Sequence, residues 1–310
     1  MDEKGLFGRA SSVAEGARAF YRARKTEVSP PFGRDFMSFR RAFTAFAVSL
    51  AAPAVAMAQQ ARQIELGYEI TFAGISGFRI DVTARFNGTT YDVESNTFKV
   101  GTLKAMTMNY VGRNRAWGGF SPEGARPSAG SLSIMVGDTP RTWLAQYGAS
   151  GFLQETHTPV WKPTPQQAIP EGDKQGSLDP LSAALSVGLA GDAACDKPVR
   201  TNDGKRRIDV MFRKIGMEPA AATGIVGAQG DVLVCEMYTK RVSGEFDEAP
   251  KEAETERERP IKIWLARFDQ TQIRYPGKLE AQTFLATIRG KILFFRERPL
   301  TQEESQAIKH

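Results

Sequence analysis

Histidine and cysteine are scarce in this chain of 310 residues, since each occurs only twice. The histidines are His157 and His310, and the cysteines are Cys195 and Cys235. The sequence has no His-Glu-x-x-His and no Cys-x-x-Cys motif, the spacings at which proteins commonly hold zinc. We therefore expect no bound metal ion and no cofactor.

Motifs for nucleophilic catalysis are also missing. Ser76 lacks the second glycine of a Gly-x-Ser-x-Gly elbow at the required place. His157, the only histidine before residue 310, is expected to lie in the proline-rich crossing, with no obvious nucleophile beside it. The glycine-rich segment 224–230 has neither a Lys-Ser/Thr end nor a following helix, so a hairpin loop explains it better than phosphate binding. We assign no catalytic residue.

Paired carboxylates are the one catalytic arrangement that the composition leaves open, because 30 acidic residues follow residue 58. Asp179 is the most suggestive single acid, although a position at the N-cap of a helix already explains it. A hydrolase that uses Asp179, Glu171 and Asp173 is therefore the least favoured of the alternatives.

Residues 37–58 have the three parts of a secretory signal peptide. A positive segment at 38–41 precedes an apolar run at 42–55, and small residues at 56–58 form a cleavage site. We expect Met37 to be the biological start, with residues 1–36 as an extra N-terminal extension or the product of a start codon assigned too early. The alternative is an uncleaved anchor, but a run of about 16 apolar residues is short for a hydrocarbon core of ~30 Å.

Cleavage after residue 58 changes the charge of the protein. The chain holds 41 basic and 35 acidic residues, of which residues 1–58 contain nine and five, so the mature part keeps 32 and 30. A net charge of +2 gives no reason to expect nucleic acid as a partner. No cysteine lies at the cleavage site directly after the apolar run, so no lipid anchor is expected. These features predict a soluble periplasmic protein without a stable membrane span.

The two cysteines have a simple interpretation in an exported chain. In an oxidising compartment they favour one disulfide, Cys195–Cys235, over a metal site. The chain-entropy model gives such a link about 4 kcal/mol for a loop of about 40 residues. The alternative, two reduced thiols in a cytosolic protein, requires that residues 37–58 are not a signal peptide.

Apolar and polar residues alternate with a period of two through most of the mature chain, which predicts β-strands. The clearest pair is 64–72 and 78–86, which we expect to form an antiparallel hairpin with one wet face and a turn at 74–77. A second hairpin should turn at Asp203-Gly204. Further strands are expected at 91–95, 106–110, 132–136, 199–201, 207–212, 231–238, 261–266, 272–276 and 281–288.

One helix is expected among these strands. Asp179 is a good N-cap, Pro180 suits the first helical position, and Gly191 is a stop signal. A single short helix near 179–190 leaves the fold class all-β and mainly antiparallel.

Three longer connections are expected between the predicted strands, all within one domain. We expect a loop at 121–127 and an extended crossing at 156–176, whose four prolines exclude a central strand. A charged surface loop is expected at 243–260. The prediction is a single β-rich domain at 59–296, followed by a flexible tail at 297–310.

The order of several short motifs resembles the bacterial domain-of-unknown-function family 3108, over nearly all of residues 64–290. The motifs are Tyr68-Glu-Ile-Thr-Phe-Ala-Gly-Ile-Ser-Gly77, Phe120-Ser-Pro-Glu-Gly124, Asp179-Pro-Leu-Ser-Ala183, Asp203-Gly-Lys205, and Trp264-Leu-Ala-Arg-Phe-Asp269 followed by Arg274-Tyr-Pro276. The charged loop at 244–260 departs from the pattern, where a tighter connection is expected. The resemblance implies an exported envelope protein with a strongly curved or open barrel-like sheet, and it implies no catalytic residue.

These observations favour a non-enzymatic periplasmic protein of the cell envelope. A bent sheet with many aromatic and methionine side chains can hold an apolar ligand in its hollow, so we expect a lipid or lipoprotein chain, or another envelope protein, as partner. A structural or scaffolding domain is the main alternative. The sequence leaves the oligomeric state open.

Overall fold

The computed structural model describes residues 61–101, 110–136, 139–165, 167–244, 259–283 and 285–308. All of these belong to one compact unit, Leu50–His310. The predicted extension at 1–36, the predicted signal peptide at 37–58, the predicted strand residues Met106 and Met108, and most of the predicted charged loop lie outside the described residues.

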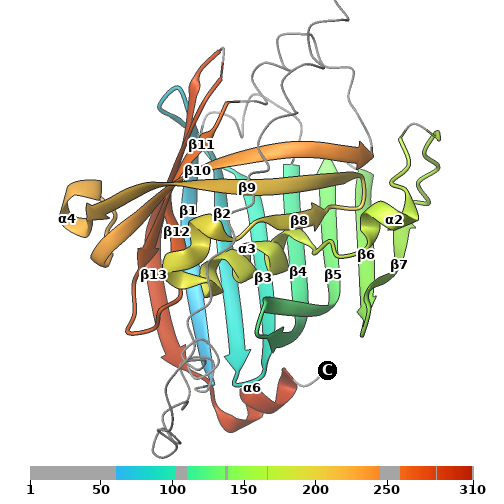
Figure 1. Cartoon of the computed structure of the whole chain (residues 1–310), viewed down its shortest axis with the longest axis horizontal. Coiled ribbons are helices and arrows are strands. Elements are labelled where there is room, and N and C mark those ends of the chain that lie inside the picture. Colours follow the sequence, from blue (N-terminus) through green and yellow to red (C-terminus); the bar gives the residue numbers. More distant parts are fainter. Residues whose placement is uncertain are drawn as a thin grey trace, which may run out of the picture. The chain divides into compact units, whose positions relative to one another are not determined.

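Thirteen strands of the described chain form one mainly antiparallel sheet, as the alternating pattern predicts (Figure 1). The strands are β1 (Arg62–Phe72), β2 (Ile75–Asn87), β3 (Thr90–Lys99), β4 (Tyr110–Ser121), β5 (Gly124–Val136), β6 (Thr139–Gly148), β7 (Gly151–Thr158), β8 (Val199–Asn202), β9 (Arg206–Pro219), β10 (Gln229–Gly244), β11 (Ile261–Arg267), β12 (Tyr275–Gln282) and β13 (Thr287–Pro299).

The strand order places the start of the described chain at the middle of the sheet. From β1 the chain runs outward strand by strand to the edge strand β7, crosses to the opposite edge at β8, and returns to β13, which pairs with β1. Tight turns make these neighbours possible, for example at Gly88, whose φ of 55° suits glycine. The sheet therefore has two edge strands, β7 and β8, and is not closed.

The crossing from β7 to β8 contains the helix that the sequence predicts. Helix α3 (Pro180–Leu189) begins after Asp179, whose carboxylate accepts hydrogen bonds from the backbone N–H groups of Leu181 and Ser182. Gly191 follows with a φ of 59°. Further helical segments of the described chain are α2 (Glu171–Lys174), the 3-10 helix η2 (Gly191–Asp196), α4 (Ala220–Thr223) and α6 (Gln302–Ala307).

The sheet curves so that β9 and β10 pass across α3, with β1 to β5 on the other side of the helix (Figure 1). Leu181 and Leu185 of α3 pack against the cluster that contains Phe86 of β2, whereas Ala183 packs with Leu233 of β10. Both sides of α3 are thus apolar. Each large side chain fully buried in such a core stabilises the fold by roughly 1.5–3 kcal/mol.

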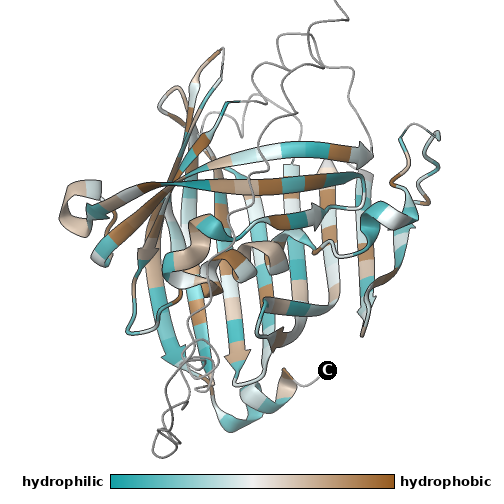
Figure 2. Ribbon diagram, viewed as in Figure 1, coloured by the Kyte–Doolittle hydropathy of each residue, from teal (hydrophilic) through white to brown (hydrophobic). Residues whose placement is uncertain are grey.

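Apolar and polar residues alternate along the strands (Figure 2). In β10, Val232 and Val234 face one cluster, while Leu233 and Cys235 face the cluster around α3. Residues 232–235 are covered on both faces, which explains why they form a continuous apolar run.

Several predicted boundaries are wrong. The first turn lies at Ala73 and Gly74, and strand β2 already begins at Ile75. The expected loop at 121–127 is only a tight turn, because β5 begins at Gly124 and accommodates Pro127 beside a bulge. His157 lies on β7, opposite Trp143, and not in the crossing.

The C-terminal part also differs from the prediction. The expected strand at 281–288 spans a turn between β12 and β13, which Thr283 closes by bonding the backbone of Ala286. The residues predicted as a flexible tail hold the end of β13 and helix α6, whose N-terminus is a capping box of Thr301 and Glu304.

Candidate functional site: an apolar hollow beside helix α3

The concave face of β1 and β2 is built from alternate apolar residues. The register pairs Leu66 with Val82 and Tyr68 with Ile80, so these side chains point to the same face of the sheet. Leu66 is buried, whereas Tyr68, Ile80 and Val82 are half-buried. Together with α3 and β12 they enclose an open cavity of about 260 Å³, which we call the apolar hollow.

Helix α3 forms one wall of the apolar hollow. Leu181 and Leu185 contribute half-buried side chains, and Ala184 is exposed between them. Gly188 allows the helix to approach β12 closely, since a Cβ atom there would lie 2.7 Å from the backbone oxygen of Arg274. Side chains that face one another in this way but stay half-exposed are typical of a ligand site rather than of a filled core.

A second apolar cavity, of about 200 Å³, lies beside the same helix. Its walls include Val210, Phe212 and Met237 of β9 and β10. Ala184 and Gly188 line both cavities, so the two apolar spaces adjoin each other at α3.

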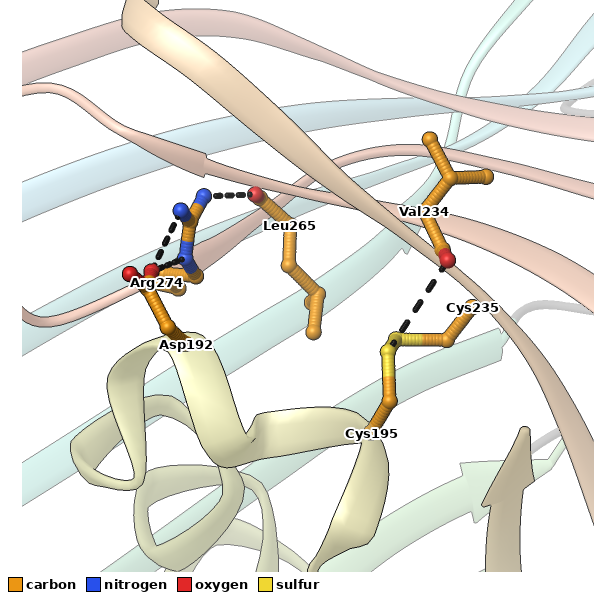
Figure 3. Close-up of a disulfide and its surroundings, with 6 residues drawn as sticks. All are labelled: Asp192, Cys195, Val234, Cys235, Leu265 and Arg274. Atoms are coloured by element: carbon orange, nitrogen blue, oxygen red, sulfur yellow. Dashed lines mark hydrogen bonds and ion pairs between the residues drawn. A yellow bond between two sulfur atoms is a disulfide. The ribbon is translucent and has the colours of Figure 1, made fainter. Parts of the chain in front are cut away.

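Arg274 is the only charged side chain among the described residues that line the two cavities. Its guanidinium is fully buried, and it donates hydrogen bonds to the backbone oxygen of Leu265 and to the carboxylate of Asp192 (Figure 3). It also donates to the backbone oxygen of Asp231. The Arg274 guanidinium holds the pKa of Asp192 below its usual range. These bonds satisfy the positive charge of Arg274, so the side chain joins η2 to the sheet.

The disulfide Cys195–Cys235 fixes the same end of the helical segment. It links η2 to β10, and the Cys195 sulfur also lies 3.9 Å from the backbone oxygen of Val234 (Figure 3). Both sulfurs are buried beneath α3 in the cluster that contains Leu265. The predicted disulfide is thus present, and together with Arg274 it anchors the C-terminal end of the helical wall.

The N-terminal end of α3 is held by a buried polar group. The carboxylate of Asp179 is buried, and Gly130 of β5 approaches it so closely that a Cβ atom there would lie 2.6 Å from the Asp179 Cβ. Burial raises the pKa of Asp179 to about 6, against the opposing effect of its bonds from Ser182 and Leu181. The hydroxyls of Tyr91 and Ser182 lie 2.7 Å apart, which joins α3 to β3.

The structure gives the three candidate carboxylates separate partners. Asp179 is occupied as the N-cap, and Glu171 accepts a hydrogen bond from Lys174 at 2.5 Å. The backbone oxygen of Asp173, rather than its carboxylate, accepts a hydrogen bond from the Arg207 guanidinium at 3.0 Å. No set of three or more His, Cys, Asp or Glu side chains in the described part of the chain could hold a metal ion. Residues 224–228 lie in the connection from β9 to β10, as expected for a hairpin loop, and residues 229 and 230 begin β10.

The sequence predicted β1 and β2, which line the apolar hollow, but not the role of Arg274. The predicted strand at 272–276 is wrong, because β12 begins only at Tyr275 and runs to Gln282. The signal for the hollow is the half-exposure of its apolar residues, which only the curvature of the sheet creates. Arg274 lies 82 residues from Asp192 along the chain, so no local pattern connects them.

None of the described helices has the length and apolarity needed to cross a bilayer. Comparison of the chain with protein family models, with curated proteins and with solved structures finds no match.

Proposed function

We propose that this protein binds a hydrocarbon chain of a lipid or a lipidated protein in the apolar hollow. The observation that carries the proposal is a set of apolar side chains, half-exposed, that face one another across a cavity between the sheet and α3. The residues that bear this most directly are Tyr68, Ile80, Val82, Leu181 and Leu185.

The chemistry of the lining favours an acyl chain over a polar ligand. Aliphatic and aromatic side chains supply almost all of the wall, and the one charge, on Arg274, is already bonded to Asp192 and to backbone oxygens. The adjoining cavity across α3 adds about 200 Å³ to the 260 Å³ of the hollow. Sites for small ligands usually hold ~300–1,000 Å³, which suits one chain rather than a whole lipid bilayer fragment.

The setting of the proposal is the bacterial envelope. Residues 37–58 have the pattern of a signal peptide, and the disulfide Cys195–Cys235 is of the kind that persists in an oxidising compartment. We propose a binding role without catalysis, because the candidate carboxylates Asp179 and Glu171 already have other partners.

The test is a titration with N-phenyl-1-naphthylamine, a neutral apolar dye that fluoresces in dry sites. Ala184→Trp places a large side chain where both cavities meet, at an exposed position that the fold tolerates. Ala222→Trp, at an exposed position of α4, is the matched control. We expect the affinity for the dye to fall at least about tenfold in Ala184→Trp, which corresponds to ~1.4 kcal/mol of lost apolar contact.

The control should bind the dye as the unchanged protein does. Equal affinity in all three proteins would contradict the proposal, because the dye would then bind elsewhere.

A further inference from the structure

A larger cavity, of about 490 Å³, lies on the other side of the molecule from β1 and β2, where strands β5 to β7 meet the turn between β8 and β9. In Figure 1 this turn lies beside β6. We define the cationic pocket by six of its lining residues, Leu132, Ile134, Arg141, Trp161, Lys162 and Lys205. It shares no lining residue with the apolar hollow.

Strand register assembles the floor of the cationic pocket. Ile134 of β5 pairs with Arg141 of β6, and Leu132 pairs with Trp143, so these four side chains share one face. Trp143 in turn pairs with His157 of β7. The floor is therefore a continuous strip that is apolar in the middle and carries a cation at Arg141.

The turn between β8 and β9 closes the pocket from the other side. Gly204 packs on the ring of Trp143, and a Cβ atom there would lie 2.4 Å from the indole. The Trp143 Nε1–H donates a hydrogen bond to the carboxylate of Glu155 on β7, at 2.8 Å, which fixes the orientation of the ring. Lys205, next to Gly204, reaches over Trp161, with its Nζ 5.8 Å from the ring centroid.

The charges around the pocket are mostly positive. Arg141, Lys162 and Lys205 contribute three permanent cations, against the single carboxylate of Asp203. That carboxylate accepts hydrogen bonds from Arg206, at 2.7 and 3.0 Å, and from backbone N–H groups in its own turn. Because Asp203 is already neutralised, an anion that enters the pocket meets a net positive field.

We propose that the cationic pocket binds an amphipathic organic anion, namely a phosphate or carboxylate group joined to an apolar ring or chain. The anionic group lies among Arg141, Lys162 and Lys205. The apolar body lies on Leu132 and Ile134, with the ring of Trp161 beside it. This site is separate from the apolar hollow and stands whether or not the hollow binds lipid.

The test is calorimetric titration of the whole protein with 1-naphthyl phosphate, decyl phosphate, 1-naphthol and inorganic phosphate. We expect saturable binding of at least one phosphate ester. We expect binding at least tenfold weaker for 1-naphthol, which lacks the charge, and for inorganic phosphate, which lacks the apolar body. Tighter binding of the naphthyl ester identifies a soluble aromatic anion, and tighter binding of the decyl ester identifies a lipid head group with its chain.

Arg141→Gln/Lys162→Gln is the informative variant, because both side chains are exposed and their loss leaves the fold intact. We expect its affinity for the better ester to fall about tenfold. Lys278→Gln is the control, since it removes a cation that lies outside the pocket, over the indole of Trp264 at 4.4 Å. Ala184→Trp, which fills the apolar hollow, should bind the ester normally.

Two results would overturn the proposal. One is ester binding that is unchanged in Arg141→Gln/Lys162→Gln while thermal unfolding shows the variant to be folded. The other is 1-naphthol binding as tightly as its phosphate ester, which would show that the positive charges have no role.

Discussion

Arg274 donates two hydrogen bonds to the carboxylate of Asp192, at 2.8 and 2.6 Å, although its guanidinium is fully buried and the aspartate side chain is 65 % exposed. The pair joins η2 to the segment that leads into β12 (Figure 3). With the disulfide Cys195–Cys235 nearby, it makes the end of α3 a fixed wall for the two apolar cavities.

Asp192→Asn should lower the free energy of unfolding by about 1–2 kcal/mol at pH 7. Breaking a fully buried ion pair typically costs ~3–5 kcal/mol, and the exposure of Asp192 reduces that figure through solvent screening. Urea unfolding of both proteins measures the difference.

The pH dependence provides the control for this variant. The pKa of Asp192 is lowered in the folded protein, so its stabilisation is present above the unfolded pKa and is lost as pH falls through the folded pKa. The difference in the free energy of unfolding between Asp192→Asn and the unchanged protein should therefore disappear in acid. A gap that widens in acid would contradict the ion-pair account.

Replacing both cysteines, Cys195→Ser with Cys235→Ser, should destabilise the protein by up to about 4 kcal/mol. The link closes a sequence separation of 40 residues, and the main effect is the greater freedom of the unfolded chain. Urea unfolding with and without reductant checks this. An unchanged midpoint on reduction would show that the disulfide does not restrain the unfolded chain.

Asp179→Asn should show its effect through pH. The pKa of Asp179 is raised to about 6 in the folded protein from 3.8, so the folded state binds the proton more tightly. Its stability contribution is full below about pH 4, is lost as pH rises toward 6, and stays lost at pH 7. Relative to Asp179→Asn, the unchanged protein should gain about 2 kcal/mol between pH 7 and pH 4.

Unfolding free energies of both proteins at several pH values measure this relative gain. Asparagine cannot titrate, so the difference between the proteins isolates the Asp179 carboxyl from all other groups. A difference in unfolding free energy that stays the same at every pH would contradict a raised pKa of Asp179.

Gly204→Ala should destabilise the protein by about 1–3 kcal/mol more than Gly74→Ala. Both glycines have a left-handed φ, of 86° and 83°, so both variants carry the same backbone strain. Only at Gly204 does the new methyl group meet a neighbour, the ring of Trp143, whereas nothing lies within 4 Å at Gly74. Thermal unfolding of the pair measures the contact, and equal losses would mean that the turn does not press on Trp143.

Local patterns were sufficient to predict many of the strands and α3, the longest helix among the described residues. The period-two alternation in 64–72 and 78–86 appears in the structure as β1 and β2, and Asp179 caps α3 as expected. These features depend only on neighbours in sequence, for which alternation and capping are direct physical signals.

Errors arose where a side chain competes with the pattern. Thr283 bonds the backbone of Ala286 and ends a strand that the apolar run appeared to continue. The Thr301 and Glu304 capping box was visible in the sequence as a Thr-x-x-Glu motif, and it signals the helix that was missed.

The candidate sites were beyond local prediction because they depend on curvature. The apolar hollow requires β2 and β12 to face α3, and the cationic pocket requires Gly204 to reach Trp143, 61 positions earlier in the chain. Alternation tells which residues share a face of a sheet but not which faces meet.

Native mass spectrometry of the protein isolated from bacterial periplasm tests the central claim most directly. The account expects the unchanged protein and Ala222→Trp to carry a non-covalent adduct with the mass of a lipid, and Ala184→Trp to carry none. A bare mass for all three proteins, or an adduct that persists in Ala184→Trp, would contradict it.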